Sequence, residues 1–254
     1  MPASKIKIAG SILDLIGNIP LVRLNRIGQE TGAEILVKPE FLNPSGSIKD
    51  RVAAYMLAAA ERDGVLQPGT TIVEASTGNT GTALAMVAAV KGYGMLIVAP
   101  ARVANPSRLA IPLSFGAHVQ TVDTPVDPDS GEVRLHGGRV EILPRQVCRQ
   151  IEHDRSDVWW PRQFSNQANV AAHRDWTARE ILDQTDGQLD AFVASVGTGG
   201  TLLGCAQALK GRTPRVLVIS CEPAGKTLLA AGETAYPIVP GITDGIIPET
   251  FSST

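Results

Sequence analysis

The chain has 254 residues, enough for one large domain or two small domains that pack together. It carries 23 lysine and arginine residues against 25 aspartate and glutamate residues, a net charge of −2 without any long block of like charges. This balance argues against a nucleic-acid partner. The apolar runs are much shorter than the roughly 20 residues that cross a bilayer, and the N-terminus lacks the apolar region of a signal peptide. We therefore expect a cytoplasmic protein with no membrane span.

Short apolar runs rich in β-branched residues alternate with helical patterns from about residue 34. The expected strands are residues 34–39, 71–75, 95–99, 118–122, 191–196 and 215–221. The expected helices are residues 49–63, 80–91, 106–115, 138–153, 170–184 and 201–209. This alternation predicts an α/β fold with helices on both faces of a parallel sheet. Ligands bind such sheets at the carboxyl ends of strands, so the turns from strand to helix are the candidate sites.

Two further stretches mark the organisation of the chain. Residues 124–138, rich in proline, aspartate and glycine, are expected to form a surface loop or lid. The pattern restarts at Trp159, where we expect a domain boundary.

The cysteine and histidine residues lack the spacing of a metal site or of a disulfide framework. We expect buried, apolar positions for the three cysteines, which are Cys148, Cys205 and Cys221. We expect surface or hydrogen-bonded core positions for the four histidines, which are His118, His136, His153 and His173. No metal ion is therefore expected.

The first glycine-rich turn, residues 43–51, places Lys49 in the opening turn of a helix. The partial positive charge of a helix N-terminus disfavours an ammonium group there and would lower the pKa of Lys49, as a Schiff-base lysine requires. The alternative is a solvated surface lysine, and position alone favours that alternative.

The second turn, residues 74–82, opens an alanine-rich helix with a run of small polar and glycine residues. Such a turn exposes backbone N–H groups beside hydroxyl groups, an arrangement that suits a carboxylate or a phosphate. Ordinary helix capping is the alternative, but it would need one serine or threonine rather than this whole run.

The third turn, residues 195–201, contains two adjacent glycines flanked by threonines. A dinucleotide-binding fingerprint fails here because Leu202 occupies the position of its third glycine. The turn suits a lone phosphate monoester better, although a tight turn that simply needs glycine is the alternative. A lysine, a carboxylate-sized nest and a phosphate-sized nest on one sheet edge together suggest pyridoxal phosphate acting on an amino acid.

Four motifs, in the same order along the chain as in the family, resemble the cysteine synthase and cystathionine β-synthase family of fold type II pyridoxal-phosphate enzymes. Within that family, they are most similar to O-acetylserine sulfhydrylase-like proteins. They are residues 16–22, 43–51, 76–81 and 197–201. The resemblance implies two parallel-sheet α/β domains with the cofactor between them. The large cofactor-binding domain would comprise residues 1–48 and 158–254. The smaller, mobile domain would comprise residues 49–157 and bind the substrate carboxylate.

The resemblance also implies a role for each site residue. Lys49 would form the internal aldimine with pyridoxal 5'-phosphate, and Asn79 would bond the phenolic oxygen of the cofactor. The cofactor phosphate would be held by Gly197, Thr198, Gly199, Gly200 and Thr201. The substrate α-carboxylate would be bound by Ser76, Thr77, Asn79 and Thr80, with Gln163 on the far side.

The implied reaction is β-replacement on an O-activated L-serine. O-acetylserine and sulfide would give L-cysteine and acetate through an aminoacrylate intermediate, with the amine of Lys49 as the base that removes the Cα proton. The family further implies a homodimer as the assembly. It also implies the C-terminal tail of serine acetyltransferase as a partner that enters the substrate cleft.

Residues 100–108 depart from the family pattern, because cysteine synthases usually carry a Pro-Glu-x-Met-Ser segment there. This segment leaves open a synthase of 2,3-diaminopropionate that uses O-phosphoserine and an amine donor. Arg102 or Arg108 could meet the extra anion of such a donor, although two solvated arginines are the preferred interpretation.

The C-terminal region is a second departure. Residues 240–248 resemble the family's loop over the cofactor, but we expect part of the large domain to be missing, since no residue matches the serine or threonine that faces the pyridine nitrogen. A weakly active homologue that binds a partner therefore stays open. A nicotinamide dehydrogenase is a third possibility, and Leu202 argues against it.

Overall fold

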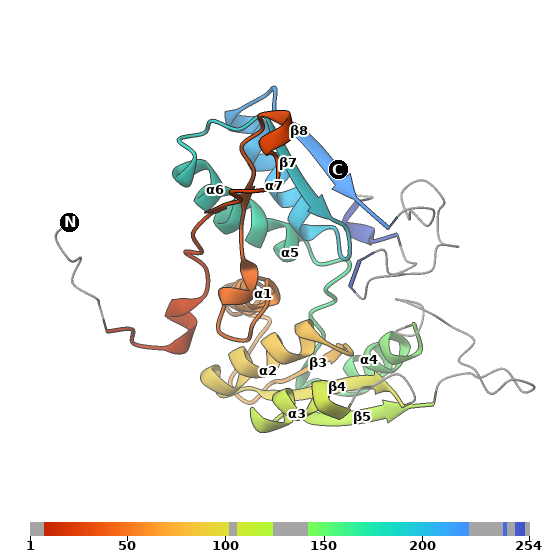
Figure 1. The fold of residues 1–254 in the computed structure, drawn as a ribbon. Helices are drawn as coiled ribbons and strands as arrows, with labels where there is room; N and C mark the ends of the chain where they lie inside the picture. The colour runs from red at the N-terminus through yellow and green to blue at the C-terminus, as the bar shows by residue number, and fades with distance from the viewer. Residues whose placement is uncertain (1–7, 102–105, 124–141, 224–240, 243–246, 252–254) are drawn as a thin grey trace, which may run out of the picture.

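The computed structural model of the chain describes residues 8–101, 106–123, 142–223, 241–242 and 247–251. A four-stranded parallel sheet has the strand order β5-β4-β3-β6. Its strands are β3 (Thr71–Ala75), β4 (Gly94–Pro100), β5 (His118–Val122) and β6 (Val158–Trp159). A separate parallel pair consists of β7 (Ala191–Ser195) and β8 (Leu217–Cys221). Figure 1 shows these two sheets in separate lobes, with helix α1 between them.

Helices follow the strands as the α/β pattern predicts. They are α1 (Lys49–Arg62), α2 (Asn79–Lys91), α3 (Pro106–Ser114), α4 (Ile142–Asp154), α5 (Gln167–Ala172), α6 (Ala178–Gln184) and α7 (Gly200–Arg212). Short 3-10 turns are η1 (Ile12–Leu15), η2 (Gln29–Thr31), η3 (Glu40–Leu42) and η7 (Glu249–Phe251). None of the helices in the described residues has the length and hydropathy that a bilayer-spanning segment needs.

The large sheet is buried on both faces because its side chains alternate between two apolar clusters. Ile72 and Ile97 join α1 and α2 in one cluster. Val73 and Val98 point the other way and pack against Cys148 of α4. The burial of Cys148 confirms the expectation for that cysteine, and Cys205 of α7 is buried too, whereas Cys221 at the end of β8 is exposed.

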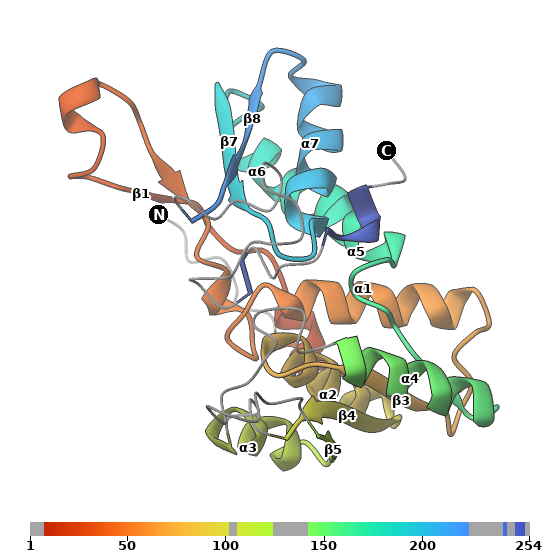
Figure 2. The same cartoon turned by 90° about the vertical axis from the view of Figure 1, so that its right-hand side faces the viewer.

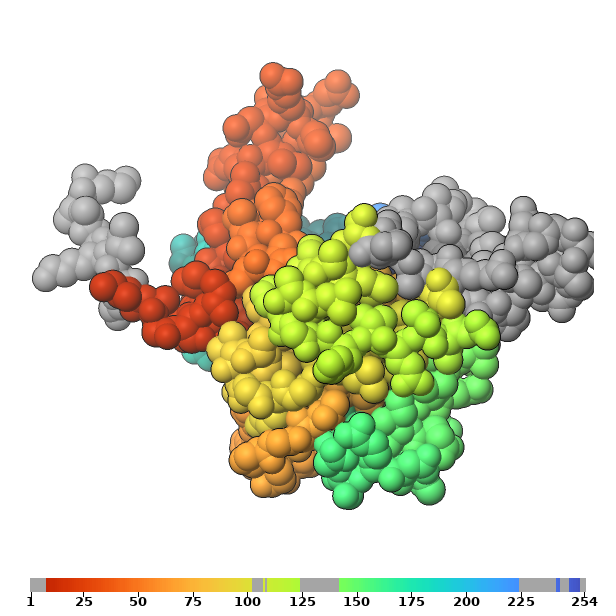
Figure 3. All heavy atoms as spheres, turned by 90° about the horizontal axis from the view of Figure 1, so that it is seen from below, coloured from red at the N-terminus to blue at the C-terminus, as the bar shows by residue number. Residues whose placement is uncertain are grey.

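Two expected elements differ from the structure. Residues 34–39 contain only the two-residue strand β2 (Leu36–Val37), which pairs antiparallel with β1 (Val22–Arg23) rather than joining a parallel sheet. Pro39 explains the short strand, because it lacks an N–H and caps the 3-10 turn η3 that follows. The segment around β1 and β2 projects beyond the rest of the chain (Figures 2 and 3).

The expected helix 170–184 is three elements rather than one. Asn166 caps α5 by accepting a hydrogen bond from the Ala168 N–H at 2.9 Å, so the helix begins earlier than expected. The π-helical turn η5 (His173–Thr177) then separates α5 from α6. Strand β6 was not predicted, and it extends the large sheet as far as Trp159. The expected loop 124–138 and the first residues of the expected helix 138–153 lie outside the described residues.

Arg51 of α1 joins the two lobes through a buried ion-pair cluster. Its side chain is fully buried, and its guanidinium donates two hydrogen bonds to Glu40 at 2.7 and 3.0 Å and two to Glu180 of α6 at 2.6 and 2.7 Å. Burial acts to lower the pKa of Arg51, but both carboxylates outweigh that effect and raise it. Two bidentate contacts fix α1 against the N-terminal segment and α6.

Glu180 also explains why the motif at residues 16–22 has a fixed path. Its carboxylate accepts hydrogen bonds from the backbone N–H groups of Asn18 and Ile19 at 2.8 and 3.2 Å, and Asn18 has the left-handed φ of 52°. Lys38 completes the cluster, 2.8 Å from Glu180.

Replacement of Arg51 by alanine should lower the free energy of unfolding by about 3–5 kcal/mol, because two largely buried carboxylates lose their shared guanidinium. Denaturant unfolding at pH 7 measures the difference. Arg62→Ala is the matched control, since Arg62 pairs with Asp63 on the surface and exposed pairs contribute about 0–1 kcal/mol. A loss for Arg51→Ala no larger than that of the control would contradict the assignment.

Glu180→Gln should make the free energy of unfolding less dependent on pH in the acidic range. Burial alone would raise the pKa of Glu180, but hydrogen bonds from Arg51 and Lys38 hold it at about 2, below the ordinary 4.5. The carboxylate therefore contributes stability above pH 4.5 that is lost as the pH falls toward 2. We expect the variant to be less stable than the wild type at pH 7 and to lose less unfolding free energy between pH 4.5 and 2. Parallel curves in that window would contradict this prediction.

Candidate active site

Lys49 is the first residue of α1, as the sequence predicts, and the preceding loop is folded onto this turn. The carboxylate of Asp50, fully buried, accepts hydrogen bonds from the backbone N–H of Ser45, at 2.6 Å, and from the Ser45 hydroxyl. Burial raises the pKa of Asp50, and the bonds from Ser45 oppose the rise. The Lys49 N–H donates to the Ser47 hydroxyl at 3.2 Å. These bonds set the direction in which the half-buried Lys49 side chain leaves the helix.

The turn between β3 and α2 is organised by Ser76. Its hydroxyl accepts hydrogen bonds from the backbone N–H groups of Gly78 and Gly81 at 3.3 and 3.0 Å. A Cβ at Gly78 would meet no atom within 4 Å, so the space beside this turn is open. The first turn of α2 has no acidic residue. Such a helix N-terminus attracts an anion.

Thr80 and Gln163, which the resemblance places on the same substrate group, are in direct contact. The Thr80 hydroxyl donates to Oε1 of Gln163 at 2.6 Å, and both side chains are buried. Thr77 is half-buried and Asn79 is exposed in the same turn. The structure therefore gathers the four residues of this turn and Gln163 at one sheet edge.

Glu74, which sequence reasoning missed, supports this edge from inside the sheet. Its carboxylate accepts hydrogen bonds from Nε1 of Trp160 at 2.8 Å and from the backbone N–H groups of Gln163 and Ala75 at 3.3 and 3.0 Å. Burial raises the pKa of Glu74 to about 7, although these three bonds act to lower it. A charged residue within the apolar strand β3 was the available signal.

The turn before α7 needs both of its central glycines. Gly199 has a left-handed φ of +80°, and a Cβ there would lie 2.5 Å from the Phe251 ring. A Cβ at Gly200 would lie 2.1 Å from Oδ1 of Asn169. The tight-turn interpretation is therefore correct for the packing of these two glycines, and it is compatible with an anion at the same helix N-terminus.

Asn169 of α5 is a second residue that the sequence did not indicate, and it joins two of the predicted groups. Its Nδ2 donates to Oγ1 of Thr198 at 2.9 Å and to the backbone oxygen of Gln163 at 2.8 Å. The Thr250 hydroxyl donates to the Thr198 backbone oxygen at 2.8 Å. The turn 197–201 and the Gln163 segment are thus held in one hydrogen-bonded unit.

His173, expected only as a surface or core histidine, lies between the remaining two groups. It is buried, its Nε2 is 3.3 Å from Oγ1 of Thr201, and the positive charge of Lys49 acts on its ring. Hydrogen bonds therefore join the turns 74–82 and 197–201 through Gln163 and Asn169, and the charge of Lys49 from the first turn acts on His173 beside them.

The residues of this region suit pyridoxal phosphate by their chemistry. The turn 197–201 offers threonine hydroxyls and the N-terminus of α7, whose first turn has no acidic residue, and this is a donor set for a phosphate. Lys49 supplies a primary amine nearby. The described residues bring together no three His, Cys, Asp or Glu side chains that could ligate a metal.

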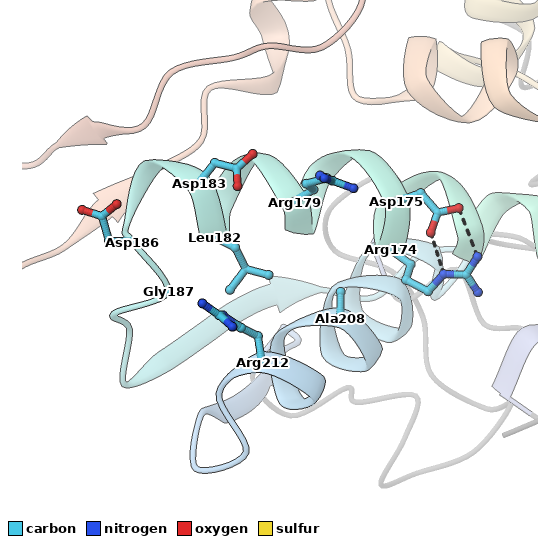
Figure 4. A pocket seen from close by; sticks show the side chains of 9 residues that line it. All are labelled: Arg174, Asp175, Arg179, Leu182, Asp183, Asp186, Gly187, Ala208 and Arg212. Atoms are coloured by element: carbon cyan, nitrogen blue, oxygen red, sulfur yellow. Dashed lines mark hydrogen bonds and ion pairs between the residues drawn. The ribbon is translucent and has the colours of Figure 1, made fainter.

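Two surface concavities lie elsewhere. One of about 750 Å³ lies between α6 and α7, with Arg174 turned toward Asp175 and both arginines and aspartates along its wall (Figure 4). The other, of about 550 Å³, lies along α1 and α5. Neither contains a predicted site residue. Arg102 and the Arg108 side chain lie outside the described residues, as do residues 240 and 243–246 of the expected cofactor loop.

Comparisons with known proteins identify the family of the chain. A family model described as "Pyridoxal-phosphate dependent enzyme" matches residues 12–252. A probable cysteine synthase of Bacillus subtilis (strain 168) is 42% identical over 246 residues, which is 96% of this chain and 75% of the relative. A cystathionine beta-synthase of Oryctolagus cuniculus is 40% identical over 260 residues, and there the match spans 99% of this chain and 45% of the relative.

Solved structures give the same result. The crystal structure of a cysteine synthase from Entamoeba histolytica superposes with a TM-score of 0.85 and 33% identity, over 98% of this chain and 71% of that chain. An O-ureido-L-serine synthase superposes with a TM-score of 0.82 and 35% identity, over 96% of this chain and 72% of that chain. The chain therefore belongs to the family of pyridoxal-phosphate dependent enzymes and is a cysteine synthase-like member with the type II fold.

Proposed function

We propose that the chain catalyses β-replacement on an O-activated L-serine, with O-acetylserine and sulfide giving L-cysteine and acetate. The observation that carries this proposal is the hydrogen-bonded unit that joins the Thr80–Gln163 pair to the turn 197–201, where the charge of Lys49 acts on the neighbouring His173. The relatives named as cysteine synthases support it.

Each group has a distinct task in this proposal. Bound pyridoxal phosphate supplies an electron sink that stabilises negative charge at the substrate Cα. The hydroxyls and N–H groups of residues 197–201 would hold its phosphate, and Asn79 would bond its phenolic oxygen. The Lys49 amine takes the proton from the substrate Cα as general base.

The substrate carboxylate would lie against residues 76–80. Because the Thr80 hydroxyl donates to Oε1 of Gln163, the amide is oriented with Nε2 available to donate to that carboxylate. Closure of residues 49–157, as a mobile domain, over the remaining residues would exclude water from the reacting atoms, with helix α1 held in place by the bonds of Arg51 to Glu40 and Glu180.

The leaving group and the nucleophile decide between related reactions. An O-ureido-L-serine synthase is among the similar structures, and the segment 100–108 differs from the usual cysteine synthase pattern. O-phosphoserine with an amine donor is therefore the alternative substrate pair, and assays with both donors distinguish the two.

The assembly and the location belong to the same proposal. We propose a homodimer, supported by the exposed apolar side chains of Val22, Val37 and Phe41 on and near the projecting segment. The tail of a serine acetyltransferase would enter the substrate cleft. A cytoplasmic location stays a prediction.

Lys49→Ala should abolish the lysine-dependent visible absorbance of protein-bound pyridoxal phosphate and lower cysteine formation by about 10²–10⁴-fold, the usual contribution of a general base. Absorbance spectra, with and without O-acetylserine and then O-phosphoserine, and product mass measure both effects. Lys91→Ala is the control, because Lys91 pairs with Glu61 at the surface. A wild-type protein without such a band would overturn the enzymatic proposal for this chain.

Thr80→Val should raise the KM for the amino-acid donor by about 10- to 100-fold, because Gln163 loses the bond that orients its amide toward a charged group. Steady-state kinetics of the pyridoxal-phosphate-loaded enzyme measure the change. Thr185→Val is the matched control, since that hydroxyl donates to the Ile181 backbone oxygen in α6. Equal KM values for Thr80→Val and the control would rule out this role for the Thr80–Gln163 pair.

A further inference from the structure

We propose that His173 is a positioning residue that holds the Thr201 hydroxyl with its hydrogen directed at the bound phosphate. This inference rests on the proposed phosphate site at residues 197–201. It assigns a task to a buried histidine that the reaction itself does not require.

Both ring nitrogens of His173 face a hydroxyl. Nδ1 lies 3.0 Å from Oγ1 of Thr177, and Nε2 lies 3.3 Å from Oγ1 of Thr201. His173 and Thr177 are the first and last residues of the π-helical turn η5, and His173 is 1% exposed. The side chains therefore form a chain of three polar groups that ends at the predicted phosphate turn.

The packing of α7 enforces this contact. Gly204 lies one helical turn after Thr201, and a Cβ there would be 2.2 Å from the Val170 backbone oxygen and 2.9 Å from Cβ of His173. Only glycine permits the two backbones to approach so closely. Since π-helical turns inside helices are frequent at functional sites, η5 independently supports a functional role for His173.

The ring is neutral at pH 7. Burial, and then the positive charges of Lys49 and Arg51, lower the pKa of His173 to about 3. A neutral imidazole has one N–H and one lone pair, so it donates to one of the two hydroxyls and accepts from the other.

An anion at residues 197–201 selects between the two tautomers. With the proton on Nε2, His173 donates to Oγ1 of Thr201, and the Thr201 hydrogen is then available to the phosphate. Nδ1 accepts from the Thr177 hydroxyl in that state. With the proton on Nδ1, Thr201 would donate to the ring and turn only lone pairs toward the anion. The first arrangement is the one that binds phosphate.

The test measures the dissociation constant of pyridoxal phosphate by absorbance titration, together with the ³¹P NMR shift of the bound phosphate. His173→Leu should weaken cofactor binding by about 10- to 100-fold and move the ³¹P resonance, because a charge-assisted hydrogen bond loses its orientation. His173→Gln keeps a donor near the position of Nε2, so its dissociation constant should stay within about 3-fold of the wild-type value. A tenfold change would correspond to about 1.4 kcal/mol. His118→Gln on β5 is the control for loss of an exposed histidine.

A double-mutant cycle separates positioning from a general structural effect. In a Thr201→Val background, His173→Leu should change the dissociation constant by less than about 2-fold, since the hydroxyl that it orients is gone. Thr177→Val gives a second probe that keeps the imidazole, and it should weaken binding by about 3- to 10-fold.

The outcomes are distinct for the two proposals. If the wild type shows no lysine-dependent absorbance with pyridoxal phosphate, the proposed function fails and this inference fails with it. If the wild type binds but His173→Leu binds as tightly, or loses the same factor with and without the Thr201 hydroxyl, the role of His173 is overturned while the proposed function stands.

Discussion

The contact between Arg51 and its two glutamates is the constraint on which the other features depend. Arg51 lies two residues after Lys49, so whatever fixes the guanidinium also fixes the first turn of α1. Four hydrogen bonds do this, two to Glu40 in the N-terminal segment and two to Glu180 in α6. With Lys38, the cluster contains two cations and two anions and is electrically balanced. Lys49 is thereby oriented without a strong net charge beneath it.

A second layer of hydrogen bonds couples the lobes near the candidate site. Glu74 belongs to the large sheet, yet its carboxylate holds the backbone of Gln163, which lies on the way to α5. Asn169 extends this network, because its Nδ2 donates both to the backbone oxygen of Gln163 and to Oγ1 of Thr198 in the turn before α7. A displacement of either sheet edge would break bonds between buried groups, and unpaired buried groups are costly. The geometry of the turns 74–82 and 197–201 is therefore set jointly.

The sequence predicted those helices and strands whose bounds are marked by residues within the element or directly next to it. Strand β5 has the expected bounds, and Lys49 begins α1 because a Gly/Pro loop precedes an alanine-rich run. The two-residue strand β6 was missed because its partner, Thr71 of β3, lies far back in the sequence. Glu74, Asn169 and His173 were missed for the same reason, since each acts through partners from other turns. The functional motifs were visible, while the residues that hold them together needed the three-dimensional structure.

Two of the groups near Lys49 carry no uncompensated charge. His173 beside it is neutral, and Arg51 is compensated by its carboxylates. The first turns of α2 and α7 have no acidic residue, so their N–H groups provide a fixed partial positive charge for two anions. In the proposed function, these fixed dipoles would bind the phosphate and the carboxylate without taking up or losing protons. The Lys49 amine would then transfer the proton while both anions stay bound, and this separation of binding from proton transfer suits the proposed β-replacement.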